Sequence, residues 1–155
     1  MSKNYRFNRS LGMLSGQISK GIGKSLQSML NKNNYKLDQI SWSIISYVKN
    51  NPNRTQQDLV MFLWIDKVKI KRVLDELESQ NILKRSIYGK DKRYNVINLT
   101  EKGISLYNNI LPFASEALSK AFKGFSESEE ELFTDMLIKV KENLKDEIGF
   151  IEKKR

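Results

Sequence analysis

Four basic side chains fall within six consecutive positions near the middle of the chain, namely Lys67, Lys69, Lys71 and Arg72. Ammonium and guanidinium groups donate hydrogen bonds to guanine O6 and N7, with about 1–3 kcal/mol of discrimination for a good pair, and they also neutralise phosphates. These residue types therefore predict contact with a nucleic acid, with all four in or beside a major groove. Arg72 lies nearer the apolar residues of the segment, so we expect it to contact phosphate or to brace the helix.

The segment that carries these bases has the pattern of a helix. Its apolar residues recur at helical spacing, as Ile70, Val73, Leu74 and Leu77. Asp66 stands where a short carboxylate can cap the first turn. A cationic first turn is unfavourable in an isolated helix, because the N-terminal end of the helix dipole is positive. An anionic partner would relieve that cost.

A second short helix is expected just before it. Thr55 can accept from the Asp58 amide while the Asp58 carboxylate reaches back, which makes a capping box. Apolar residues follow at helical spacing, as Leu59, Phe62 and Leu63. Candidate phosphate contacts at the amino end of this helix are Arg54, Thr55 and Gln56. Two short helices in this order are typical of a helix-turn-helix whose second helix enters a DNA major groove.

A charged β-hairpin is predicted after the two helices. Residues 82–88 and 94–99 are β-prone, and residues 89–93 supply the turn between them. The tip carries Lys90, Lys92 and Arg93, which can lie across a phosphate backbone or enter a narrow minor groove. We expect Asp91, the one acid at the tip, to orient Arg93 by a charge-assisted hydrogen bond.

These motifs resemble the MarR (multiple antibiotic resistance regulator) family of winged helix-turn-helix repressors. The resemblance rests on residues 65–78, on Asp91-Lys92-Arg93, and on Leu99-Thr100-Glu101-Lys102-Gly103 after it. It implies a homodimer whose first and last helices form the interface, and a small aromatic or lipophilic effector bound between these helices and the DNA-binding lobe. The chain departs from the family at Trp64, where glycine is common, and at Val68, Lys69 and Lys71, where small hydroxyl residues are common. These departures leave the preferred DNA sequence open.

The composition agrees with a polyanionic partner. The formal net charge is +9, and the chain has neither cysteine nor histidine. Disulfides and thiolate metal sites are therefore excluded, and the commonest general base and metal ligand are missing. An enzyme ranks low, no cofactor or metal site is expected, and Asp75, Glu76 and Glu78 are interpreted as solubilising charge.

The charge is also unevenly distributed. Residues 1–37 hold seven bases and no acid, residues 54–93 hold ten bases and six acids, and residues 126–155 hold six bases and nine acids. Positive charge thus lies in the N-terminal half and at the hairpin, as expected if an acidic tail faces away from DNA. The alternative is ordinary solvated surface charge.

Helices are expected on both sides of this lobe, over residues 7–29, 37–48, 100–122 and 126–151. Residues 31–34 are predicted as a loop, and Pro112 is predicted to kink or end its helix. The predicted dimer interface comprises Phe7, Leu11, Leu14, Phe133, Leu137, Val140, Leu144 and Ile148. The near-heptad apolar face of the last helix needs a partner surface. A two-fold dimer is favoured, with packing inside one subunit as the alternative.

The resemblance implies an effector pocket, and the residues expected to line it are Met13, Gln17, Trp42, Tyr47 and Tyr107. The alternative is that these side chains are plain core. The predicted class is mainly α with a small β-hairpin wing, as one domain over residues 1–155. Residues 37–100 form the winged helix-turn-helix lobe, and residues 1–33 and 101–155 form the dimerisation region.

We therefore expect a homodimeric, ligand-responsive transcriptional repressor that binds double-stranded DNA. Its operator should be pseudo-palindromic, with half-sites about 10 base pairs apart. The alternative is a winged-helix module that binds DNA non-specifically or binds a protein partner. The N-terminal residues lack the pattern of a signal peptide, and no stretch approaches the ~18 apolar residues of a membrane span. A cytoplasmic protein without membrane contact is expected.

Overall fold

The computed structural model describes residues 7–87 and 95–145. The elements are η1 (Phe7–Arg9), α1 (Leu11–Lys32), α2 (Gln39–Asn50), β1 (Arg54–Thr55), α3 (Gln56–Leu63), α4 (Lys67–Ser79), β2 (Leu83–Ile87), β3 (Asn95–Leu99), α5 (Glu101–Ala121) and α6 (Glu127–Asn143). The mainly α class with a small β-hairpin is thus confirmed.

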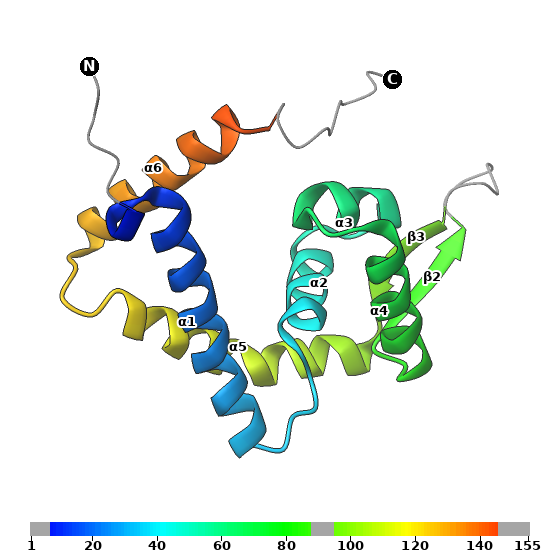
Figure 1. The fold of residues 1–155 in the computed structure, drawn as a ribbon. Coiled ribbons are helices and arrows are strands. Elements are labelled where there is room, and N and C mark those ends of the chain that lie inside the picture. Colours follow the sequence, from blue (N-terminus) through cyan, green and yellow to red (C-terminus); the bar gives the residue numbers. More distant parts are fainter. Residues whose placement is uncertain (1–6, 88–94, 146–155) are drawn as a thin grey trace.

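The helices α2, α3 and α4 and the sheet form one lobe, and α5 runs beneath this lobe to reach α1 on the other side (Figure 1). The core of the lobe consists of fully buried side chains from each of its helices and from β2 and β3, namely Ile44, Ile45, Leu59, Ile70, Leu74, Leu77, Leu83 and Ile97. Leu30 of α1 and Ile110 of α5 are equally buried and join the same core. Burial of each such side chain contributes about 1.5–3 kcal/mol, so the core holds the lobe together.

The sheet has the strand order β1–β3–β2, with antiparallel pairing throughout. The predicted hairpin is confirmed as β2 and β3, in a register that places Arg85 opposite Ile97. The short strand β1 was not predicted, because two residues give no periodic signal. Arg54 pairs with Ile97 and Thr55 with Val96, so β1 fixes the start of α3 against the hairpin.

The N-terminus of α5 packs closely against the start of the hairpin. The Thr100 hydroxyl accepts from the Gly103 amide at 3.1 Å, as predicted for its cap, and donates to the Asn81 carbonyl at 2.7 Å. The Thr100 amide donates to the Ile82 carbonyl at 3.1 Å. A Cβ at position 103 would overlap that same carbonyl oxygen. Glycine is therefore required here by close approach of the two backbones.

Two boundaries differ from the sequence predictions. The helix α1 continues through Asn31 and Lys32, part of the predicted loop, and Asn33 caps it with a hydrogen bond from its amide to the Met29 carbonyl at 3.2 Å. The helix α5 runs through Pro112 without ending. Pro112 is exposed, so water can satisfy the carbonyl that loses its helical donor.

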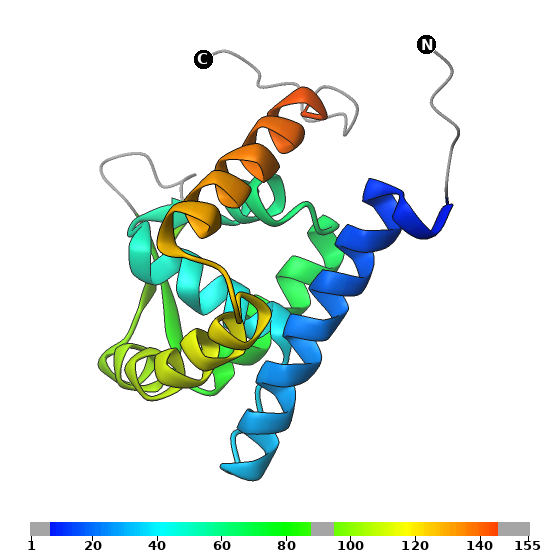
Figure 2. The ribbon, with the colours of Figure 1, turned by 90° about the vertical axis from the view of Figure 1, so that its left-hand side faces the viewer.

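The helices α1 and α6 lie on the side of the molecule away from α3 and α4 (Figure 1). Seen from that side, they form two separate rods that stand at an angle to each other (Figure 2). Edge-to-face contacts of Phe122, Phe125 and Phe133, with ring centroids 5.6–6.4 Å apart, join the end of α5 to α6. No residue of α6 is buried within the described chain.

Candidate nucleic-acid interface

The first turn of α3 is built on the predicted capping box. The Thr55 hydroxyl accepts from the Asp58 amide at 3.2 Å, and the Asp58 carboxylate accepts from the Thr55 amide at 2.7 Å. Both polar groups of Thr55 are thus used inside the cap. Arg54, the other predicted phosphate contact on this strand, is exposed. We therefore expect Arg54 to be a stronger phosphate contact than Thr55.

The turn between α3 and α4 is held at both ends. Trp64 ends α3 in the left-handed conformation, with φ 54° and ψ 39°, which explains why glycine suits this position. Asp66 caps α4 as predicted, by accepting from the Lys69 amide at 2.8 Å. The Gln56 amide group donates to the Lys67 carbonyl at 3.3 Å, which joins the first turns of the two helices.

The helix α4 presents its basic residues on one open side. Its buried stripe is confirmed as Ile70, Val73, Leu74 and Leu77, and its exposed residues include Lys67, Val68, Lys69, Lys71 and Arg72. At about 100° per residue, Val68 and Arg72 project opposite the stripe while Lys69 and Lys71 flank them. The prediction that Arg72 lies near the stripe was wrong, because two residues from Ile70 is more than half a turn.

An ion-pair cluster joins α4 to the hairpin. The Arg85 guanidinium of β2 contacts the Asp75 carboxylate at 2.8 Å and also pairs with Glu78. The Arg85 amide donates to the same Glu78 carboxylate at 3.0 Å. Asp75 and Glu78 therefore position the hairpin against α4. Their interpretation as solubilising charge was wrong, because their partner Arg85 becomes a neighbour only when β2 folds back along α4.

The cluster extends to one of the predicted DNA contacts. The Lys71 ammonium pairs with Asp75 at 2.6 Å, one helical turn away. Hydrogen bonds from Lys71 and then from Arg85 hold the pKa of the Asp75 carboxyl below its ordinary value. Asp75 is therefore ionised at neutral pH and ties Lys71 and Arg85 together on the open side of α4.

Loss of Arg85 should loosen the hairpin. We expect Arg85→Ala to lower the free energy of unfolding by roughly 1 kcal/mol, because a partly exposed ion-pair cluster is worth about that much. Chemical denaturation at pH 7 measures the effect. Lys84→Ala, on the exposed neighbouring residue of the same strand, is the matched control. Equal stability of the two variants would contradict the structural role of Arg85.

The same cluster predicts a pH dependence. Because the folded-state pKa of Asp75 is lowered, its contribution is present above the unfolded-state pKa and is lost as pH falls through the folded-state pKa. The stability difference between wild type and Asp75→Asn should therefore shrink in acid, below about pH 4. Unfolding curves from pH 7 to pH 3 measure this difference, and a difference that grew in acid would contradict the assignment.

Comparisons with known proteins agree with this geometry. A MarR family transcriptional regulator from Listeria monocytogenes, solved in complex with a 26mer DNA, has a TM-score of 0.83. Its sequence is 27% identical, and the match covers 95% of this chain and 98% of that one. No family model matches the sequence. In sequence and in fold, the chain is similar to MarR-family transcriptional regulators.

Two other relatives extend this result. The HTH-type transcriptional regulator MhqR of Bacillus subtilis (strain 168) is 27% identical over 124 residues, which cover 79% of this chain and 86% of MhqR. BpsR of Bordetella bronchiseptica, whose DNA binding is regulated by 6-hydroxynicotinic acid, has a TM-score of 0.77 and is 21% identical over 90% of this chain and 98% of its own. The second likeness concerns the fold alone. These MarR-family relatives are transcriptional regulators and not enzymes.

The tip of the predicted hairpin carries the other predicted DNA contacts. Lys90, Asp91, Lys92 and Arg93 lie outside the described residues, as does Ile148 of the predicted dimer interface. The strands that lead to the tip are described, and Arg85 anchors one of them to α4. The strands β2 and β3 therefore fix where the hairpin lies next to α4.

The predicted effector residues line neither of the two hollows described below. Trp42 stacks on Tyr107, with ring centroids 5.4 Å apart and planes at 14°. Tyr47 packs on Phe62 at 4.2 Å, and burial raises the pKa of the Tyr47 phenol. Met13 is half-buried and Gln17 is exposed, both on α1. The aromatic side chains thus pack in pairs between helices, as the plain-core alternative expects.

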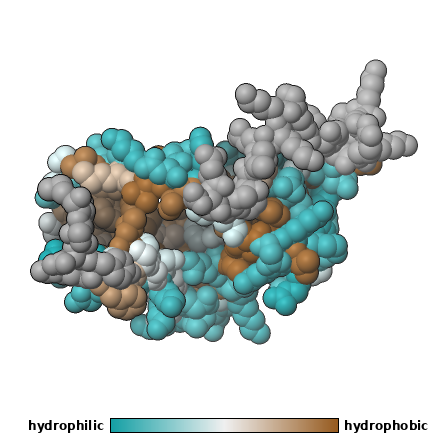
Figure 3. Space-filling model, turned by 45° about the horizontal axis from the view of Figure 1, so that its top comes forward, coloured by the Kyte–Doolittle hydropathy of each residue, from teal (hydrophilic) through white to brown (hydrophobic). Residues whose placement is uncertain are grey.

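Two hollows lie elsewhere in the described chain. The first is an apolar groove of about 440 Å³ between α1 and α6, lined by residues that include Leu11, Leu14, Ile18, Phe133 and Leu137. Figure 3 shows apolar side chains gathered around a hollow on this side of the molecule. Four of these five residues belong to the predicted dimer interface. Sequence reasoning therefore found this surface but assigned it to dimerisation alone.

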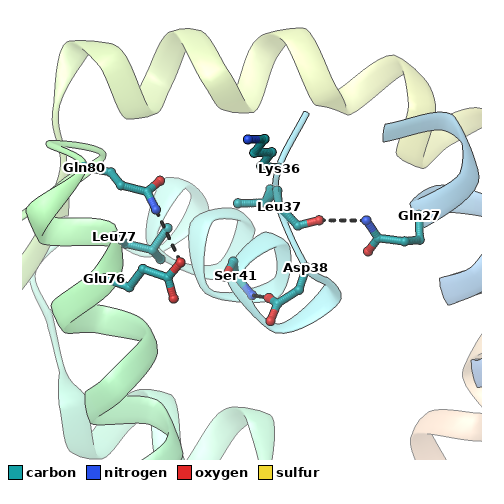
Figure 4. Close-up of a pocket in the computed structure, with 8 residues that line it drawn as sticks. All are labelled: Gln27, Lys36, Leu37, Asp38, Ser41, Glu76, Leu77 and Gln80. Atoms are coloured by element: carbon teal, nitrogen blue, oxygen red, sulfur yellow. Dashed lines mark hydrogen bonds between the residues drawn. The ribbon is translucent and has the colours of Figure 1, made fainter. Parts of the chain in front are cut away.

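The second hollow is a polar cleft of about 390 Å³ between the end of α1, the start of α2 and the end of α4. Figure 4 shows Gln27 donating to the Leu37 carbonyl on one side and Gln80 next to Glu76 on the other. Asp38 caps α2 by accepting from the Ser41 amide at 2.7 Å. These polar groups are hydrogen-bonded to one another within the chain. We therefore interpret the cleft as the place where α1, α2 and α4 meet.

The described residues form neither a metal site of acidic side chains nor a membrane span. Within residues 7–87 and 95–145, no set of three or more acidic side chains is placed to hold a metal ion. In the same part of the chain, no helix is both long and apolar enough to cross a membrane.

Proposed function

We propose that this protein is a homodimeric, sequence-specific DNA-binding transcriptional repressor that responds to a small effector and acts in the cytoplasm. The observation that carries the proposal is the open, basic side of α4, which has Arg72 opposite the buried stripe and Lys69 and Lys71 beside it. The similarity to a Listeria regulator complexed with DNA supports the same role for α4. In this arrangement the N-terminal part of α4 enters the major groove.

The rigidity of the α3–α4 pair supports sequence-specific binding over charge attraction alone. Two caps and the Gln56 bond hold the first turns of both helices, while Arg85 holds the hairpin next to α4. A rigid presentation of side chains is what base recognition requires, since only contacts to base edges carry sequence information. Non-specific binding needs charge but not this geometry.

Dimerisation is proposed through α1 and α6, with residues 37–100 as the DNA-binding lobe and residues 1–33 and 101–155 as the dimerisation region. The apolar side chains Leu11, Leu14, Met136 and Leu137 are 40–54% exposed in the single chain. An apolar face of this kind is costly in water and suits a self-complementary interface. A two-fold dimer in turn implies a pseudo-palindromic operator with half-sites about 10 base pairs apart.

For the effector, we propose a small aromatic or lipophilic molecule at the apolar groove between α1 and α6. The groove has the volume and the apolar lining that such a ligand needs. Because residues that line the groove also belong to the proposed dimer interface, a ligand bound there would change how the two subunits are arranged. The aromatic pairs formed by Trp42 and Tyr47 are a poorer choice, because they already fill their own space.

Selection from a random duplex pool at near-physiological salt tests the proposed function. We expect enrichment of a pseudo-palindrome with half-sites one helical turn apart. Binding at low salt without enrichment would contradict the proposal and favour the non-specific alternative, whose affinity falls steeply with salt. No binding to any duplex would favour a protein partner.

Variants of the basic residues separate contacts to bases from contacts to phosphate. We expect Lys69→Ala and Arg72→Ala to change the preferred sequence, at about 1–3 kcal/mol for each base that the variant no longer recognises. Arg54→Ala and Arg93→Ala should weaken binding to all duplexes about equally and should reduce the salt dependence. Competition binding with selected and scrambled duplexes measures both effects. Unaltered selectivity after Lys67, Lys69 and Lys71 are replaced together would contradict placing α4 in the groove.

A further inference from the structure

Val68 is an apolar residue on the outer side of the basic turn of α4. Its side chain is 79% exposed, the highest value among the exposed large apolar residues of the described chain. It lies between Lys67 and Lys69, and Arg72 follows one helical turn later on the same side. The buried stripe of α4 lies on the opposite side.

Packing within the subunit does not account for a valine here. Val68 is absent from the hydrophobic core and from the partly buried residues packed against it. A β-branched side chain also lowers helix propensity slightly, because it restricts the χ1 angle. The folding of α4 would be served as well by a small polar residue. The position of Val68, between two lysines on the side proposed to face DNA, points instead to an external contact.

The major groove offers one apolar group to such a contact. Thymine alone among the four bases presents a methyl group on this edge, and small apolar side chains pack against it. Cytosine carries only a hydrogen at C5, where thymine has its methyl group, and it presents an amino donor at C4, which valine cannot satisfy. An exposed branched aliphatic side chain in the first turn of α4 therefore matches thymine by chemistry and by position.

We propose that Val68 recognises thymine, by packing against its 5-methyl group in each half-site of the operator. This inference rests on the proposed function and adds a base preference to it. Val68 and Arg72 are four residues apart, so their positions differ by about 6 Å along the helix axis, which is close to two base-pair steps of about 3.4 Å. With α4 along the groove and Arg72 on guanine, each half-site should hold a thymine within about two base pairs of a guanine.

The test removes one methyl group from the DNA. Each thymine of a selected duplex is replaced in turn by uracil, which changes nothing else on the base, and dissociation constants are measured for wild type, Val68→Ala and Val68→Ile. At one thymine position, uracil should lower the affinity of wild type roughly fourfold for each half-site. This is the loss expected when the burial of one methyl group is removed. Val68→Ala should lose most of the preference for thymine over uracil at that position, because alanine lacks the two γ-methyl groups of valine. Val68→Ile should keep the preference for thymine.

The control variant is Ile104→Ala, which shortens an exposed aliphatic side chain of α5 and should keep the wild-type preference for thymine. Val68 is exposed, so its variants should fold as wild type does, and thermal unfolding checks this. Equal loss on uracil substitution in wild type and Val68→Ala would overturn the inference while leaving the proposed function intact. The same holds if wild type is indifferent to every thymine. Failure to select any duplex would overturn both.

Discussion

Replacing Gly103 by alanine is expected to lower the free energy of unfolding by roughly 3 kcal/mol, the upper end of the usual cost of overpacking. The added Cβ would overlap the Ile82 carbonyl oxygen, which is backbone and already accepts from the Thr100 amide. Neither group can move without breaking the contact between α5 and the start of the hairpin. Chemical denaturation at a fixed protein concentration measures the effect, since the proposed dimerisation would make apparent stability concentration-dependent.

A second glycine provides the matched control for this prediction. Gly21 lies inside α1, and a Cβ added there meets no atom within 4 Å. Gly21→Ala should therefore raise the free energy of unfolding by about 0.5–1 kcal/mol, the helix-propensity gain of alanine over glycine. Opposite signs for the two substitutions are expected. A stability of Gly103→Ala equal to that of wild type would contradict the close approach of α5 to the hairpin.

Local features of the lobe could be predicted because their chemistry lies within a few residues. The two residues of the capping box, Thr55 and Asp58, are three positions apart, and the Asp66 and Thr100 caps are equally short. The stripe on α4 follows from the helical period alone. Each of these features depends on sequence spacing and not on how distant elements pack, so each was confirmed by the structure.

Features that depend on folded neighbours could not be predicted in the same way. Arg85 lies ten residues from Asp75 along the chain, and only the return of β2 beside α4 brings them to 2.8 Å. The strand β1 was missed because two residues give no periodic signal. Trp42 and Tyr47 were assigned to one effector pocket through the family resemblance, but they lie in separate aromatic pairs with Tyr107 and Phe62.

The exposed face of α4 illustrates a limit of reasoning from charge. The lysines of the basic turn suggested DNA contacts, and counting charges directed attention to them. Helical geometry instead places Val68 and Arg72 farthest from the buried stripe, with the lysines to the sides. The proposed groove contact therefore combines an apolar and a guanidinium side chain, and charge alone identified Arg72 but not Val68.

A glutamate in place of Leu137 is expected to abolish the dimer and to lower affinity for a palindromic operator at least about 100-fold. Leu137 is 40% exposed in the single chain and lines the groove with Leu11 and Leu14. Burial of an unpaired carboxylate in an apolar interface is strongly unfavourable. Loss of the link between two DNA-binding lobes removes the avidity of paired half-sites, which is worth about 10²–10⁴ in affinity. Sedimentation velocity and operator titration measure the two effects.

The same helix carries the control. Lys139→Glu also adds negative charge, two residues further along α6, but from an exposed polar position that is not part of the groove. It should remain dimeric and should bind a single half-site and the whole operator as wild type does. Leu137→Glu should still bind a single half-site with wild-type affinity, because the described α6 contributes no buried residue to the lobe. A dimeric Leu137→Glu would move the interface away from α1 and α6, whereas a monomer with full operator affinity would mean that each lobe binds DNA independently.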